Sequence, residues 1–221
     1  MDDLTTAERY VDDVLEGRIV ACAKLKQLCA MLRPRFTGGY KKWHYDADAA
    51  NRVIGFVERF CCVPSGRKYG KPMVLEDYER FILQVAFGFV DDEGLRQFNE
   101  VLWWVAKKNG KTSLIAAIAH YMMTSDGEGK PEVYVIASAE NQAGLCYGGV
   151  DTMRRQSPSL AKWERTGEVK DRKKQGILCD RTNGYVVTLS GSPKSLDGPN
   201  PHLVIADEIA AWDDRGPYDQ M

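Results

Sequence analysis

Apolar residues recur with helical spacing through most of the first ninety positions. Between residues 5 and 33 they lie on one face of a predicted helix capped by Thr6: Tyr10, Val14, Leu15, Ile19, Ala23 and Leu28. Pro34 and the glycines at 38 and 39 are predicted to interrupt this helix. Further helices are predicted from about Asp46 to Phe60 and from Glu76 to Phe87, the latter followed by a turn at 91–94.

After residue 100 the pattern changes to short apolar runs that alternate with helical segments. Strands are predicted at 101–105, 133–137, 185–189 and 203–206, and helices at 111–123 and from about residue 140. This alternation predicts an α/β fold, in which helices flank a mostly parallel sheet, preceded by an N-terminal helical segment.

Composition places the chain among globular proteins. It has 221 residues, of which 44% are hydrophobic and 28% charged, with a net charge of -1. Any contact with nucleic acid must therefore come from a local basic patch. The best candidate is residues 154–174, which hold eight Lys or Arg around Trp163; the alternative is a solvated charged face.

The cysteines and the length of the apolar runs indicate the cellular compartment and whether the chain spans a membrane. The six cysteines form no CxxC pair and have no nearby histidines, which favours reduced, buried thiols in a cytosolic protein. No apolar run approaches the roughly 18 residues of a membrane span, so we expect no membrane association.

Residues 110–112 have the pattern of the end of a phosphate-binding loop. They lie between the predicted strand at 101–105 and an Ala-rich helix, where backbone N–H groups and the helix dipole favour phosphate. Gly110 lets the backbone approach closely, Lys111 supplies a positive charge, and the Thr112 hydroxyl can bind Mg²⁺. The first glycine of the usual loop is missing, since Val105 stands five positions before Gly110. A chance match is the alternative.

A second half of such a site follows the last predicted strand. Asp207 and Glu208 come directly after 203–206, 96 residues beyond Lys111. An aspartate at this point can hold Mg²⁺, and the adjacent glutamate can orient and deprotonate the attacking water. Read alone, the two residues could be solvated acids at a strand end. In the correct order after residues 110–112, they favour a nucleotide site.

These motifs resemble the large terminase subunit of tailed bacteriophages, the ATPase that pumps DNA into the procapsid. Terminases commonly drop the first loop glycine and place a basic residue early in the loop, as residues 106–112 (AKKNGKT) do. Further similarity lies in four stretches: 10–21, 52–73, 137–143 and 190–212.

The resemblance implies a P-loop NTPase of the additional-strand, catalytic-glutamate type. Residues 1–50 would be an N-terminal helical segment and 51–221 the ATPase domain. The implied cofactors are ATP and Mg²⁺. The implied partners are double-stranded DNA, the terminase small subunit, the portal protein and further copies of the chain in a pentameric ring, in the host cytoplasm.

The family's site residues carry over where the residues match. The nucleotide-binding candidates are Lys108, Asn109, Gly110, Lys111, Thr112 and Ser113, with Tyr78 and Glu79 on the adenine side. The metal candidates are Thr112 and Asp207. The catalytic candidates are Glu208 as base, Lys107 as γ-phosphate sensor and Lys194 as a finger reaching a neighbouring subunit.

Three of these assignments have open alternatives. Lys107 could be a solvated loop lysine. Lys194 would bind a phosphoryl group less well than an arginine, because a lysine lacks the planar, bidentate donors of a guanidinium. Glu79 stands where the family often has glutamine, and a carboxylate cannot donate to adenine N7. A plain exposed helix glutamate is the alternative there.

The end of the chain departs from the family pattern. Met221 comes 13 residues after Glu208, whereas the family continues with another strand and a nuclease domain. We therefore expect a fragment or one piece of a split protein, a possibly incomplete sheet and no nuclease domain. The rival functions are a different P-loop nucleic-acid motor, such as a helicase, and a non-catalytic terminase fragment acting through protein interaction.

Overall fold

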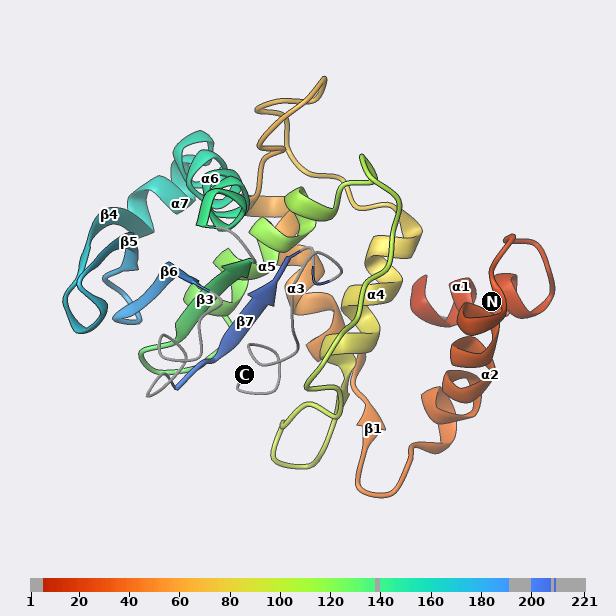
Figure 1. Cartoon of the computed structure of the whole chain (residues 1–221). Helices are drawn as coiled ribbons and strands as arrows, with labels where there is room; N and C mark the ends of the chain where they lie inside the picture. Colours follow the sequence, from red (N-terminus) through yellow and green to blue (C-terminus); the bar gives the residue numbers. More distant parts are fainter. Residues whose placement is uncertain (1–5, 138–139, 191–199, 208, 210–221) are drawn as a thin grey trace. The chain divides into compact units, whose positions relative to one another are not determined.

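The computed structural model describes residues 6–137, 140–190, 200–207 and 209. It divides into two compact units, residues 1–58 with 74–105 and residues 59–73 with 106–221. The expected boundary at residue 50 falls inside a helix. The elements, labelled in Figure 1, are α1 (Thr6–Leu15), α2 (Ala23–Gly38), β1 (His44–Tyr45), α3 (Ala47–Phe60), α4 (Asp77–Gly88), β2 (Phe89–Val90), α5 (Lys111–Thr124), β3 (Glu132–Ala137), α6 (Glu140–Gln156), α7 (Pro158–Trp163), β4 (Glu164–Val169), η1 (Lys170–Arg172), β5 (Lys174–Cys179), β6 (Gly184–Ser190) and β7 (Leu203–Ala206).

The first unit is helical, with one short antiparallel pair formed by β1 and β2. Tyr10 of α1 stacks on Phe81 of α4 with ring centroids 4.7 Å apart, in a core that also contains Phe89. The single helix predicted over 5–33 is wrong: it is two helices, separated at residues 16–22 by a turn with Gly17 at φ 79°. Pro34 lies inside α2, which runs on to Gly38.

The strand predicted at 101–105 is also wrong. No described strand pairs with this segment, and Leu102 and Trp104 are 77% and 87% exposed. An apolar run becomes a strand only where a neighbouring strand accepts and donates its backbone hydrogen bonds. The apolar composition of residues 101–105 alone was therefore not enough to predict a strand.

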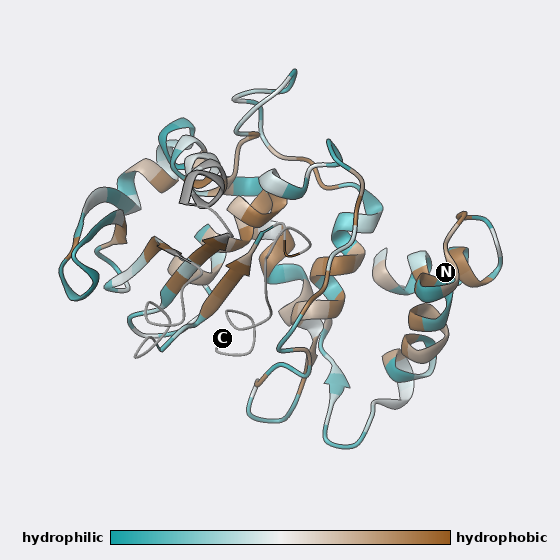
Figure 2. Cartoon of the chain, viewed as in Figure 1, coloured by the Kyte–Doolittle hydropathy of each residue, from teal (hydrophilic) through white to brown (hydrophobic). Residues whose placement is uncertain are grey.

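The second unit is built around a sheet with the order β4-β5-β6-β3-β7. Strand β3 pairs in parallel with β6 and β7, whereas β5 pairs antiparallel with both β4 and β6. The sheet is therefore mixed rather than mostly parallel. Helices α5 and α6 pack against the parallel strands. In Figure 2, β3, β7 and much of α5 are hydrophobic, while the β4–β5 end is hydrophilic.

The β4–β5 hairpin was not predicted. Its strands carry charged residues on exposed positions, so they lack a continuous apolar run. Arg172, in the turn between them, fixes the hairpin to the sheet by donating to Glu132 at 3.2 Å and to the Tyr185 hydroxyl at 3.3 Å.

All six cysteines are free thiols, and four of them are buried. Among the residues described, no helix combines the length and apolar character needed to cross a membrane.

Candidate nucleotide-binding site

The loop before α5 has the backbone conformation of a tight turn. Lys108 and Gly110 both have positive φ, at 69° and 72°. The Asn109 side chain holds the turn by donating from Nδ2 to the Ala106 carbonyl at 3.1 Å. Gly110 is the N-cap of α5 and accepts from the Leu114 N–H at 3.0 Å. The N–H groups of the first turn, from Lys111 to Ser113, therefore have no carbonyl of their own helix to bond, as at any helix start.

The structure joins the two halves of the predicted site. Lys111 Nζ lies 2.7 Å from Asp207 Oδ1, and the two residues are 96 positions apart. Asp207 directly follows β7, and its N–H donates to Ile136 of β3 at 3.0 Å. The carboxyl ends of parallel strands are where ligands bind in α/β sheets. The site thus lies at the expected edge.

Helix α6 borders this pair. Cys146 is buried, and its electrostatic neighbours are Asp207 and Lys111. Burial, with a smaller contribution from the Asp207 charge, raises the pKa of the Cys146 thiol to about 12, so the group stays neutral at physiological pH. Gly149, one turn later, approaches Thr112. Sequence reasoning missed this side of the site; the only available signal was the Gly-Gly pair inside a predicted helix.

His120 fixes α5 against its neighbours. Its side chain is fully buried, and Nε2 donates to the Val150 carbonyl of α6 at 3.0 Å. Nδ1 lies 2.9 Å from Glu164 Oε1, at the start of β4. The helix that begins with Lys111 is therefore held two turns later by a polar contact with two other elements.

The oxygen donors near Lys111 suit a magnesium ion. Mg²⁺ takes hard oxygen ligands and is commonly bound through one or two carboxylates together with phosphate oxygens and water. The Asp207 carboxylate and the Thr112 hydroxyl are donors of this kind, and Thr112 is exposed. The residues present fit the ion that the sequence motifs imply.

Tyr78 and Glu79, the adenine-side candidates, belong to the first unit. Glu79 is buried, so the exposed-glutamate alternative is wrong. Its Oε2 accepts from the Glu76 N–H at 2.9 Å in a capping box at the start of α4. The Tyr78 hydroxyl donates to Glu79 Oε1 at 3.4 Å, and burial together with the Glu79 charge raises the pKa of Tyr78 to about 12.

The remaining candidates are the three predicted catalytic residues, of which the structure describes one. Lys107 is exposed in the loop before α5. Glu208 and Lys194 lie outside the described residues. Their roles remain predictions.

Half of the positive charges in the basic stretch at 154–174 pair with neighbouring carboxylates. Four of its eight cations pair with carboxylates at 2.8–3.2 Å: Arg154 and Arg155 with Asp151, Arg165 with Asp180, and Arg172 with Glu132. Trp163 packs edge-on against Phe60 at 4.9 Å, so its ring is part of the fold. Fewer positive charges are therefore available to bind the phosphates of a DNA duplex than the eight Lys and Arg in the sequence indicate.

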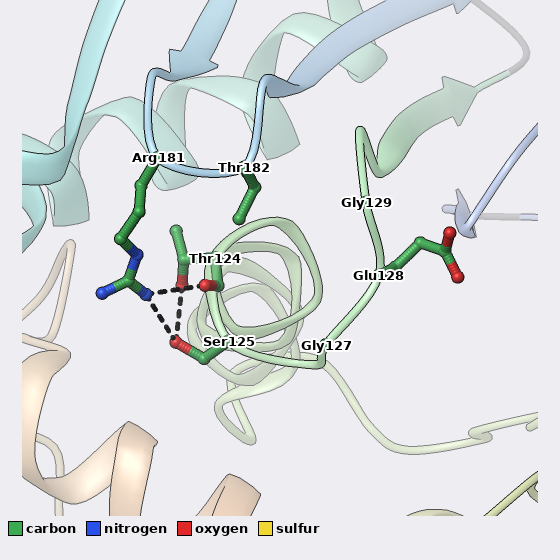
Figure 3. A pocket seen from close by; sticks show the side chains of 7 residues that line it. All are labelled: Thr124, Ser125, Gly127, Glu128, Gly129, Arg181 and Thr182. Atoms are coloured by element: carbon green, nitrogen blue, oxygen red, sulfur yellow. Dashed lines mark hydrogen bonds between the residues drawn. The ribbon is translucent and has the colours of Figure 1, made fainter.

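A cavity of about 580 Å³ lies at the opposite end of α5 from the Lys111 pair. Figure 3 shows Arg181 pointing to the last turn of α5, where it donates to the Thr124 carbonyl at 2.7 Å, while Glu128 extends away from it. Thr182 donates to the Met123 carbonyl at 2.9 Å. These groups satisfy carbonyls left open at a helix C-terminus, which explains them without a ligand.

Comparison with known proteins gave matches to a family model, to a protein sequence and to a solved structure. The family model "Terminase large subunit, ATPase domain" matches residues 77–221. The large terminase subunit of Enterobacteria phage HK97 is 32% identical over 173 residues, covering 77% of this chain and 32% of that protein. The crystal structure of the HK97 bacteriophage large terminase matches with a TM-score of 0.57 and 25% identity, covering 71% of this chain and 30% of that one. The chain thus spans about a third of these relatives' length.

Proposed function

The chain belongs to the family of terminase large subunit ATPase domains, and on that premise we propose that it binds ATP with Mg²⁺ and hydrolyses it. In the whole terminase, this hydrolysis would drive double-stranded DNA into the procapsid. The observation that carries the proposal is the contact between Lys111 and Asp207, at 2.7 Å. It brings a phosphate-binding cation and a metal-binding carboxylate together from distant parts of the sequence.

The pair can exchange its partners when a ligand arrives. The side chains of Lys111 and Asp207 are 34% and 17% exposed, so their attraction is screened by water and is weak by the standard of buried pairs. A triphosphate offers Lys111 several oxygens with more charge than one carboxylate. Asp207 is then available as a metal ligand, beside the hydroxyl of Thr112.

The loop and the first turn of α5 would hold the phosphates. The N–H groups from Lys108 to Ser113 would bind the anion together with the positive end of the helix dipole, and the Asn109 bond to Ala106 holds the conformation of the turn. Bound Mg²⁺ would neutralise the phosphate oxygens and polarise the phosphorus.

The chemistry of hydrolysis falls to side chains around the γ-phosphate. Glu208 would accept a proton from the attacking water, Lys107 would contact the γ-phosphate, and Lys194 would reach the site of a neighbouring copy in the ring. Tyr78 and Glu79 would lie on the adenine side, where Glu79 also caps α4. DNA, the small subunit, the portal protein and a pentameric ring are the proposed partners of the whole protein.

The test measures ATP binding with Mg²⁺ and phosphate release, with and without double-stranded DNA. Lys111→Ala removes the charge-assisted contacts to phosphate and should weaken binding roughly tenfold to a hundredfold. Asp207→Asn should weaken binding in Mg²⁺ more than in EDTA, and Glu208→Gln should abolish turnover while binding persists.

Lys130→Ala is the matched control. Lys130 is an exposed lysine of the same unit, paired with Asp171 at 3.3 Å, and its loss removes the same charge outside the loop. Equal binding by wild type and Lys111→Ala would contradict the nucleotide site. Binding without phosphate release in any condition would favour a non-catalytic role.

A further inference from the structure

Thr112 meets helix α6 through its methyl group, at a glycine. A Cβ atom placed on Gly149 would lie 3.2 Å from Thr112 Cγ2, which is closer than the 3.5–4.0 Å, roughly, of an optimal carbon–carbon contact. The absence of a side chain at position 149 is therefore what gives the methyl group its space.

The χ1 rotamer that places the Thr112 methyl at Gly149 also sets the direction of the Thr112 hydroxyl. Cγ2 and Oγ1 are attached to the same Cβ and occupy fixed staggered directions, so fixing one of them fixes the other. With the methyl directed at α6, the hydroxyl takes a different direction, and Thr112 as a whole is exposed to solvent. A second χ1 well, common for threonine in helices, turns Oγ1 toward a preceding backbone carbonyl instead.

Helix α6 is held in place next to the contact. The carbonyl of Val150, the residue after Gly149, accepts from the fully buried His120 of α5 at 3.0 Å. Cys146, one turn earlier on the same face of α6, is buried. A side chain added at Gly149 would therefore displace the Thr112 methyl more readily than it would move α6.

We propose that Gly149 is a positioning residue for the nucleotide site: it keeps the Thr112 methyl against α6 and so directs the Thr112 hydroxyl to the magnesium ion. The inference rests on the proposed function, because it assigns a partner to the Thr112 hydroxyl. It adds a residue of α6 to a site otherwise formed by the loop, α5 and the end of β7.

The experiment measures ATP affinity of the purified chain in Mg²⁺ and in EDTA by calorimetric titration. Gly149→Ala should weaken binding in Mg²⁺ by about threefold to tenfold, the effect of forcing a side chain off its rotamer, and should leave binding in EDTA unchanged. In the Thr112→Ser background, which keeps the hydroxyl and lacks Cγ2, the same substitution should have little further effect.

Gly144→Ala and Gly148→Ala are the matched controls on the same helix. Outside its own helix, a Cβ at either position meets no atom of the described residues within 4 Å. Both variants therefore gain helix propensity without a contact at Thr112, and they should bind ATP as wild type does. Urea unfolding of every variant shows whether it is folded.

Three results would overturn the inference. These are an equal loss of affinity in Mg²⁺ and EDTA, an undiminished loss in the Thr112→Ser background, and wild-type affinity for Gly149→Ala. Failure of the wild-type chain to bind ATP in Mg²⁺ would instead overturn the proposed function, and with it the inference, before any substitution is considered.

Discussion

Replacing His120 by alanine should destabilise the second unit severely. The side chains of His120 and Glu164 are both fully buried and lie 2.9 Å apart. Glu164 Oε2 has no hydrogen-bond partner among the described residues, so His120 supplies the one described partner of this carboxyl group. His120→Ala leaves both oxygens unpaired in an apolar interior and removes the bond from Nε2 to Val150.

The size of the effect follows from the cost of an uncompensated buried group. Breaking a buried pair by removing one partner costs about 3–5 kcal/mol, a large part of the roughly 5–15 kcal/mol that stabilises a typical domain. A chain of this size loses about 2–4 °C in Tm per kcal/mol. We therefore expect a Tm lower by roughly 6–20 °C.

Urea unfolding followed by circular dichroism measures the loss. Glu164→Gln is the control, because an amide of the same shape still bonds Nδ1 and should cost about 1 kcal/mol. Replacing both residues together, with His120→Leu and Glu164→Met, should recover much of the loss. A cost for His120→Ala below about 1 kcal/mol would refute the reasoning, since a surface substitution costs as little.

Three further substitutions test other parts of the fold. Ser157→Ala removes the N-cap of α7, because the Ser157 Oγ accepts from the Leu160 N–H at 3.2 Å. The free energy of unfolding measured in urea should fall by about 1 kcal/mol, and an unchanged urea midpoint would contradict the role of the cap. Gly88→Ala places a Cβ 2.6 Å from Tyr45 Cε2 and should cost about 1–3 kcal/mol by overpacking, which a wild-type midpoint would disprove. Burial raises the pKa of Cys29 from its ordinary value near 9.0 to about 11, so its contribution to stability is complete below the ordinary value and is lost as the pH rises to about 11. Cys29→Ala should reduce this alkaline loss in a pH series of unfolding curves, and an unchanged slope would count against the assignment.

The elements that were predicted correctly are those whose own sequence repeats a single period. Helices α3 and α4 have an apolar face at helical spacing, and β3, β6 and β7 are short runs made mostly of apolar residues. The position of Asp207 followed from the sequence, because it comes directly after β7 and the carboxyl ends of parallel strands share one edge. Lys111 reaches it from a loop that no described strand directly precedes.

The features that were missed depend on partners distant in the chain. The apolar run at 101–105 and the charged β4–β5 hairpin show that pairing, rather than composition, decides what becomes a strand. The burial of Glu164 is explained by His120, 44 residues earlier. Nothing local to Gly149 indicates that Thr112 lies opposite it.

The pairing of Lys111 with Asp207 also bears on how a ligand reaches the site. A positive and a negative charge 2.7 Å apart nearly cancel at longer range, so they exert little pull on an approaching anion. In the proposed nucleotide site, the exposed lysines at 107 and 108 would therefore supply the attraction across the Debye length of about 10 Å in 0.1 M salt. On that proposal, added salt should slow the binding of nucleotide, while the rate of release, which contacts with Lys111 would govern, should change much less.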